Sequence, residues 1–432
     1  MSSVRKLEPG RTLLLDGPAS ATVISGLASV FGAELKPRQK VIVRRGRRIP
    51  IEALEPTELE IVVGQGGSVA EVEIRAIPSS WEELAKEAIS KPSPTRIMVL
   101  GAIDTGKTSF CTYLANMALK AGRSVGIVDA DVGQSDIGPP CTIGFAQITK
   151  PVKDLSEVRA QHIFFLGDKT PSHLVDRALE GIKAMLEVAR GVDFLVVNTD
   201  GWVSGPGAVE YKKAIASLVE PSVIAVLARG NELDHMLKAL ENWPTRAIEV
   251  PPLVKERDRE IRRELRAQGY RRYLENAKVI SISLDWVEVD GHLPGSGLRP
   301  SRERVELISS ILGIDPLYCE EDLRRVTLVF DEEGPLPEQE AISRLEEEVG
   351  KEVEIVMKGQ EKNLLVSLHD EDGRFLGLGI IVCIDYRKRI IRIFTPADED
   401  AVAKICVGRI RVGEDGNELE APQLKSEGGQ ID

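Results

Sequence analysis

A glycine-rich octapeptide constrains the fold of this chain more than any other segment. It reads Gly101-Ala-Ile-Asp-Thr-Gly106-Lys107-Thr108, follows the apolar run 96–100 and precedes a predicted helix over Thr108–Ala121. This is the GxxxxGK[ST] pattern in its strand–loop–helix context, where backbone N–H groups and the helix N-terminus surround phosphate oxygens. The loop residues expected to bind a nucleotide are Gly101, Ala102, Ile103, Asp104, Thr105, Gly106, Lys107, Thr108 and Ser109. Lys107 would reach the β- and γ-phosphate oxygens, and the Thr108 hydroxyl would bind Mg²⁺.

Apolar runs alternate with helical segments around this loop. From residue 96 onwards the runs RIMVLG, SVGIVDAD, DFLVVNTDG and SVIAVLA are separated by predicted helices, one of them over 172–190. Continuous apolar strands between helices are typical of a parallel sheet that is buried on both faces. The pattern therefore predicts an α/β domain with a parallel sheet.

Two β-rich regions flank that domain. Short β-type runs separated by turn residues fill 11–77, and alternating patterns return after 278, with predicted helices over 303–312 and 338–349. A capping box, Ser80 with Glu83, and the Pro-rich joint 91–95 mark the first boundary. We expect an N-terminal β domain at 1–78, a connecting helix and linker at 79–95, a P-loop domain at 96–278, a C-terminal β-rich domain at 279–415 and a disordered tail at 416–432.

Composition narrows the class of protein. The 432 residues are enough for two or three domains, and 56 basic against 68 acidic side chains give a net charge of −12, which excludes a broadly basic nucleic-acid-coating protein. Five scattered cysteines with no CxxC pair argue for a reducing compartment and against a disulfide framework or zinc knuckle. No apolar stretch reads as a signal peptide or a membrane span, so a cytoplasmic protein with no membrane partner is expected.

A pair of aspartates follows the second strand of the α/β domain, in Val128-Asp129-Ala-Asp131-Val-Gly133-Gln134. A carboxylate at the C-terminal end of a parallel strand faces the nucleotide crevice, where it can hold the water shell of a metal ion or accept a proton from a hydroxyl group. We expect Asp129 to be a structural or outer-shell group and Asp131 to be the catalytic one. Together with Thr108 they are the predicted metal site.

The motifs admit a GTPase, an ATP-driven motor or a kinase. The stretch ARGNELDH stands where a guanine-reading NKxD motif would follow the strand SVIAVLA, which counts against a GTPase. The segment 255–273, KERDREIRRELRAQGYRRY, is rich in arginine and is called the lid segment below. Such a segment can place cations on a transferring phosphoryl group, but its interleaved acidic residues fit a solvated helix at least as well.

Five segments in order resemble the polynucleotide 5′-hydroxyl kinase family, which includes the RNA kinase of the eukaryotic cleavage and polyadenylation factor and its archaeal counterparts. They are GAIDTGKT, DADVGQSDIGPPCTIG (129–144), LGDKTP (166–171), NTDGWVSGPG (198–207) and RRELRAQGYRRYL (262–274). Stretches 26–35 and 376–396 are similar to the N- and C-terminal β domains of the family, so nearly the whole chain is covered.

The resemblance implies roles for single residues. Asp131 would orient or deprotonate the 5′-hydroxyl group, with Gln134 beside it. Thr170 and Pro171 would form a clasp on the acceptor strand, and Trp202 would stack on an acceptor base. Arg257, Arg262 and Arg266 correspond to lid arginines. The adenine-contacting residues are not assigned, because 34–48 differs from the family pattern.

The function expected from the resemblance is transfer of the γ-phosphate of ATP, with Mg²⁺, to the 5′-hydroxyl group of RNA or DNA. One alternative is a catalytically silent ATP-binding scaffold subunit of an RNA-processing complex. A small-molecule kinase of the same nucleotide-binding class is a further alternative, less favoured because of the flanking β domains and the NTDGW segment. The sequence identifies neither protein partners nor the oligomeric state.

Overall fold

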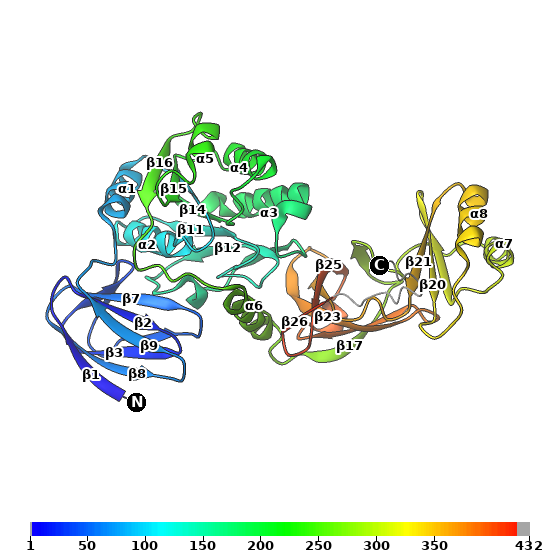
Figure 1. Cartoon of the computed structure of the whole chain (residues 1–432), viewed down its shortest axis with the longest axis horizontal. Coiled ribbons are helices and arrows are strands. Elements are labelled where there is room, and N and C mark those ends of the chain that lie inside the picture. The colour runs from blue at the N-terminus through cyan, green and yellow to red at the C-terminus, as the bar shows by residue number, and fades with distance from the viewer. Residues whose placement is uncertain (1, 421–432) are drawn as a thin grey trace, which may run out of the picture. The chain divides into compact units, whose positions relative to one another are not determined.

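The computed structural model describes residues 2–420, and the chain divides into two compact units, 1–269 and 270–432. The first unit contains the N-terminal β-sheets and the domain built around the P-loop (Figure 1). The second unit contains the C-terminal β-rich region. The predicted fold class, a central α/β P-loop domain with β-rich regions on either side, is confirmed.

The N-terminal region is a pair of antiparallel sheets. One has the order β1-β8-β3-β6 and the other β5-β4-β7-β2-β9. Their strands are β1 (Ser2–Leu7), β2 (Thr12–Asp16), β3 (Ala19–Ser25), β4 (Ala28–Val30), β5 (Ala33–Leu35), β6 (Lys40–Val43), β7 (Arg48–Ala53), β8 (Thr57–Val63) and β9 (Ser68–Val72). Leu15, Ile51 and Ile61, which come from both sheets, are buried in one core, and exposed positions alternate with buried ones along β8. This alternation is the signature of a two-layer β-structure.

The P-loop domain is a seven-stranded sheet with the order β13-β12-β11-β14-β10-β15-β16. Its strands are β10 (Thr95–Gly101), β11 (Val125–Ala130), β12 (Thr142–Ile148), β13 (His162–Phe165), β14 (Phe194–Thr199), β15 (Val223–Ala228) and β16 (Thr245–Glu249). Five of them, β11, β14, β10, β15 and β16, are parallel. β12 and β13 instead extend one edge in antiparallel pairing, which the sequence pattern did not predict.

Helices cover both faces of this sheet. α1 (Ser79–Ser90) and α2 (Lys107–Lys120) pack on the side of Ile97 and Val99, while α3 (Val175–Val188), α4 (Pro206–Val219) and α5 (Asp234–Ala239) pack on the side of Met98 and Leu100. Short 3₁₀ turns occur at Leu155–Glu157, Pro171–His173 and Ala189–Gly191. Because β10, β11 and β14 are parallel, the segments that follow them meet at one edge of the sheet.

Local details differ from the sequence-based expectations. α1 begins after Pro78 with no side-chain cap, and the Ser80 hydroxyl donates to Glu249 instead of forming a capping box with Glu83. The capping-box interpretation was wrong because Ser80 lies within reach of the carboxylate that ends β16. α4 begins inside the Gly-rich stretch after Trp202, at Pro206, a residue suited to the first position of a helix.

The second unit has a larger sheet with the order β17-β24-β23-β22-β25-β18 and a three-stranded sheet β19-β20-β21. The strands are β17 (Lys278–Ser283), β18 (Glu288–Asp290), β19 (Tyr318–Glu321), β20 (Arg325–Phe330), β21 (Glu352–Met357), β22 (Leu364–His369), β23 (Phe375–Asp385), β24 (Ile390–Thr395) and β25 (Lys404–Val412). α7 (Arg302–Leu312) and α8 (Gln339–Val349) share a core with the smaller sheet, and a 3₁₀ turn lies at Glu399–Ala401. α6 (Arg259–Tyr273) crosses the division between the units.

The predicted disordered tail is ordered at its start. β26 (Glu418–Leu419) pairs with β25, and the Asp415 carboxylate accepts the Asn417 N–H in the intervening turn. The remainder of the predicted tail, 421–432, lies outside the described residues. All five cysteines are free, as expected, and within 2–420 no helix is long and apolar enough to cross a membrane.

A single buried amide joins the N-terminal β region to the P-loop domain. The Asn116 side chain on α2 donates to the carbonyl oxygens of Phe31 and Val152, each at 2.8 Å, and accepts the Val152 N–H at 2.9 Å. Asn116 is 1% exposed, so these three hydrogen bonds are shielded from solvent.

We therefore expect Asn116→Ala to lower the free energy of unfolding by about 2–4 kcal/mol, because three buried backbone groups lose their partner. Chemical denaturation followed by circular dichroism measures this change. Asn242→Ala, at an exposed position, is the control. Equal stability of the two variants would contradict the assignment.

Candidate active site

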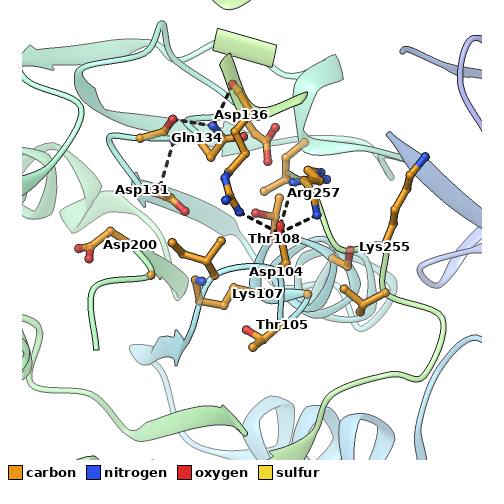
Figure 2. Close-up of a pocket in the computed structure, with 18 of the residues that line it drawn as sticks. Asp104, Thr105, Lys107, Thr108, Asp131, Gln134, Asp136, Asp200, Lys255 and Arg257 are labelled. Carbon is orange, nitrogen blue, oxygen red and sulfur yellow. Dashed lines mark hydrogen bonds and ion pairs between the residues drawn. The ribbon is translucent and has the colours of Figure 1, made fainter. Parts of the chain in front are cut away.

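A cleft of about 500 Å³ lies where the loops after β10, β11 and β14 meet. Its wall includes the P-loop, the loop after Asp129, the clasp residues, Trp202 and the lid segment, and Figure 2 shows ten of its side chains labelled. The volume lies in the range of small-molecule and cofactor sites. Every residue that lines the cleft belongs to the first unit.

The P-loop has the geometry that its sequence predicts. Gly106 caps α2 with φ +89°, a left-handed conformation that favours glycine. The Lys107 ammonium folds back and donates to the Ala102 carbonyl oxygen at 2.8 Å. Burial lowers the pKa of Lys107. A buried cation whose hydrogen-bond acceptor is a neutral carbonyl is suited to receive an anion.

Asp129 is completely buried at the end of β11 and accepts four hydrogen bonds. One oxygen accepts the Asn198 amide at 3.0 Å and the Asp131 N–H at 3.3 Å. The other accepts the Asp136 N–H at 2.8 Å and the Ser135 hydroxyl at 3.2 Å. Burial, with the charge of Asp136, raises the pKa of Asp129 to about 6. These bonds occupy the acceptor positions of the carboxylate, an arrangement suited to a structural role rather than to holding the water shell of a metal ion.

Asp131 lies two residues further along and lines the cleft, in contrast to Asp129. One of its oxygens accepts the Gln134 N–H at 3.1 Å. Burial raises the pKa of Asp131 to about 7, against the opposing effect of the Lys107 charge. The Gln134 side chain donates to the Gly133 carbonyl oxygen and, at 3.4 Å, to the Arg262 carbonyl oxygen of the lid segment. Of the two aspartates, Asp129 and Asp131, Asp131 is thus the one that lines the cleft.

A partly buried arginine from the N-terminal region, Arg47, forms ion pairs with this loop and with Asp154. The Arg47 guanidinium pairs with Asp136 and lies 3.6 Å from Asp154. Burial acts to lower the pKa of Arg47, but these two carboxylates outweigh it and the pKa is raised. Arg47 therefore connects the N-terminal β region to the loop that carries Asp131.

The loop after β14 is held by a buried ion pair. The Lys212 ammonium on α4 is fully buried and lies 2.8 Å from Asp200, whose other oxygen accepts the Trp202 N–H at 2.8 Å. The Trp202 ring stacks on Tyr211 with centroids 5.7 Å apart. Trp202 is half-buried. It packs against the core of the P-loop domain and also lines the cleft.

The clasp residues lie beside the Asp131 loop. The Thr170 hydroxyl accepts the Ser172 N–H at 3.4 Å at the start of the short turn that includes buried Pro171. A Cβ atom at Gly133 would lie 3.0 Å from the Lys169 carbonyl oxygen, so the two loops approach closely. Thr170 and Pro171 both line the cleft.

The arginines of the lid segment reach the P-loop. Arg262 lies 3.2 Å and Arg257 3.7 Å from the Asp104 carboxylate, and Arg266 also lines the cleft. Burial, together with the neighbouring Arg47, lowers the pKa of Arg257. Several guanidinium groups at the mouth of a P-loop form a site for phosphate oxygens.

The structure thus brings the predicted residues together, with Gly101, Ala102 and Asp129 behind the cleft wall rather than on it. Several other residues of the site were not predicted from the sequence. Phe31, Arg47, Arg48, Trp81, Asp136, Asp154 and Asp200 line the cleft, and Lys212 lies beneath it. Asp200 could have been suspected, since it stands in the NTDGW stretch after a parallel strand. The N-terminal residues carry no comparable signal in the sequence.

Lys212→Met should destabilise the protein, because it leaves the buried Asp200 carboxylate without its counter-ion. A loss of about 3–5 kcal/mol is expected for a broken buried pair. Lys213→Met is a matched control, since Lys213 is the neighbouring residue and pairs with exposed Glu210. Denaturant unfolding of both variants measures the difference. A Lys212 variant as stable as the control would show that this ion pair does not hold the loop.

Known proteins match this architecture. Residues 101–276 match the P-loop family of the mRNA cleavage and polyadenylation factor CLP1. The chain is 34% identical to polyribonucleotide 5′-hydroxyl-kinase PF0112 of Pyrococcus furiosus, over 79% of this chain and 95% of that protein. It is 32% identical to the kinase TK1956 of Thermococcus kodakarensis over the same shares.

More distant matches agree. Clp1 of Bos taurus, also named a polyribonucleotide 5′-hydroxyl-kinase, is 27% identical over 62% of this chain and 68% of that protein. The solved structure of a Clp1p–Pcf11p complex superimposes with a TM-score of 0.66 at 15% identity, covering 95% of this chain and 98% of that one, which supports the fold. On the archaeal identities and their coverage, this chain belongs to the Clp1-type polyribonucleotide 5′-hydroxyl-kinase family.

Proposed function

We propose that this protein is an ATP- and Mg²⁺-dependent kinase that phosphorylates the 5′-hydroxyl group of RNA. The observation that carries the proposal is the convergence of Lys107, Asp131 and the lid arginines on one cleft beside Trp202. The archaeal relatives named as polyribonucleotide kinases support the choice of RNA as the acceptor. The same chemistry extends to a DNA 5′-end, because the 5′-hydroxyl group is common to both.

The residues present fit a nucleotide with Mg²⁺. Thr108 lies in the first turn of α2 on the cleft wall, and Asp131 lies across from it, so hydroxyl and carboxylate oxygens, the ligands that Mg²⁺ prefers, face the same space. Within 2–420 no cluster of three His, Cys, Asp or Glu side chains could hold a metal ion alone, which fits an ion held partly by phosphates. Bound Mg²⁺ would neutralise charge on the β- and γ-phosphate oxygens.

The reaction is an in-line displacement at phosphorus. The 5′-oxygen of the acceptor forms a bond to the γ-phosphorus, the bond from that phosphorus to the β–γ bridging oxygen breaks, and ADP leaves. Asp131 accepts the proton of the hydroxyl group. Lys107 and the guanidinium groups of Arg257, Arg262 and Arg266 stabilise the charge that develops on the phosphate oxygens.

The acceptor would be held by a few residues of the cleft rather than by a broad basic surface, which the net charge of −12 does not provide. Trp202, held against Tyr211, offers its ring to a terminal base, and Thr170 and Pro171 line the same cleft. Stacking is tolerant of sequence and needs no broad basic surface. We expect recognition of only a few nucleotides at one end, and a cytoplasmic location stays a prediction from the sequence.

The direct test incubates the purified full chain with γ-labelled ATP, Mg²⁺ and a short 5′-hydroxyl RNA. We expect label on this RNA, none on a 5′-phosphorylated control RNA, and a loss of about 1,000-fold or more in Lys107→Ala, because the phosphate charge then lacks its cation. Lys120→Ala on the far end of α2 is the control variant. Tight ATP binding without transfer would contradict the proposal and favour the scaffold alternative.

A further inference from the structure

Asp104 occupies the fourth position of the P-loop. Its side chain contacts the lid segment, which the P-loop motif does not require. Its φ of +55° is left-handed, which is uncommon for a residue other than glycine. Figure 2 shows its side chain turned toward Arg257. A carboxylate in a phosphate-binding loop repels a bound phosphate group. We therefore expect an interaction of Asp104 that offsets this repulsion.

The Asp104 carboxylate holds the lid segment at two residues. One oxygen, Oδ2, accepts the Arg257 backbone N–H at 2.9 Å and the Arg262 guanidinium at 3.2 Å. The Arg257 guanidinium lies 3.7 Å from the other oxygen. The Asp104 side chain is only 10% exposed, so these contacts are shielded from solvent.

The backbone of Asp104 takes part as well. Its carbonyl oxygen accepts the Arg229 guanidinium at 3.0 Å, and that guanidinium lies 3.7 Å from Glu256 of the lid segment. Asp104 therefore contacts Arg257 and Arg262 of the lid segment directly, and it is linked to Glu256 through Arg229.

Two further contacts anchor the lid segment and the residues just before it through carbonyl oxygens. The Arg48 guanidinium donates to the Leu253 carbonyl oxygen, just before the lid segment, at 3.3 Å. Arg257 Nε donates to the Gly46 carbonyl oxygen at 3.3 Å. Asp104 differs from these anchors because its carboxylate contacts both the Arg257 and the Arg262 side chains from within the P-loop. The charges of Asp136 and Asp154 also act on Arg257.

We propose that Asp104 is a positioning residue that holds Arg257 and Arg262 over the P-loop, both before and while the nucleotide is bound. The proposal rests on the proposed kinase function. Asp104 supplies the counter-charge that keeps the two guanidinium groups together, and the lid segment then retains the nucleotide and presents its arginines to the γ-phosphate. The competing role is electrostatic competition, in which Asp104 draws the arginines away from the phosphates.

The two roles predict opposite effects of Asp104→Asn. Asparagine keeps the shape and can still accept the Arg257 N–H, so the change removes mainly the charge pairing. If Asp104 positions the lid, the nucleotide should dissociate about tenfold faster, as expected for the loss of one charge-assisted contact. If Asp104 competes with phosphate, the nucleotide should dissociate more slowly.

The experiment uses the full chain with Mg²⁺ and a fluorescent N-methylanthraniloyl derivative of ATP, chased with excess unlabelled ATP in a stopped-flow instrument. Asp331→Asn is the matched control, because it removes a carboxylate from an exposed ion pair with Lys358 in the second unit. This measurement needs no RNA, so it decides the role of Asp104 even if the chain transfers no phosphate. Unchanged or slower dissociation in Asp104→Asn overturns the proposal.

A double-mutant cycle separates positioning from a general structural effect. Single-turnover phosphate transfer should fall about tenfold in Asp104→Asn, while the KM for RNA changes less than about twofold. In an Arg257→Gln, Arg262→Gln background the same substitution should change the rate by less than about threefold, since Asp104 acts through those two arginines. Fully multiplicative losses in the combined variant would contradict the proposal.

Discussion

The buried Asp129 carboxylate is the interaction on which the rest of the site depends. A carboxylate with no exposed surface must be paired or hydrogen-bonded, because removing a charge from water is costly. Asp129 meets this requirement with four donors from the loop that follows it and from β14. The same bonds fix the backbone at Asp131 and Asp136. The position of Asp131 on the cleft wall therefore depends on the hydrogen bonds that the buried Asp129 carboxylate requires.

The same loop is joined to the N-terminal region by an ion pair. Asp136 pairs with Arg47, and Arg47 also lies near Asp154, so one guanidinium joins three segments that are far apart in the sequence. The lid segment is anchored to the same region through the Gly46 carbonyl oxygen. The N-terminal β region is thus part of the wall of the site, and its packing on α2 through Asn116 has a consequence for the cleft as well as for stability.

Much of the P-loop domain and of its cleft could be predicted from the sequence, because the P-loop, the aspartates at strand ends and the apolar strands are local sequence patterns. Lys107 and Asp131 follow directly from strands whose ends must meet at one sheet edge. The antiparallel edge β12–β13 was not predicted, since its pairing partner is chosen by tertiary packing. Arg47 and Lys212 were missed for a related reason. Their partners, Asp136 and Asp200, lie 89 and 12 residues away, and no spacing rule joins them. The roles of Thr170 and Trp202 came from the family resemblance alone.

The central claim is that two aspartates separated by one residue have different roles. Asp129 holds the loop in place through its hydrogen bonds, and Asp131 accepts the proton of the acceptor hydroxyl group. The most direct test compares Asp129→Asn and Asp131→Asn by denaturant unfolding and by single-turnover transfer from γ-labelled ATP to 5′-hydroxyl RNA. Asp129→Asn should lose about 2–4 kcal/mol of stability, because an amide NH₂ group then faces two donors. Asp131→Asn should keep its stability and lose about 100-fold or more in rate. Full transfer by Asp131→Asn, or undiminished stability of Asp129→Asn, would contradict the account.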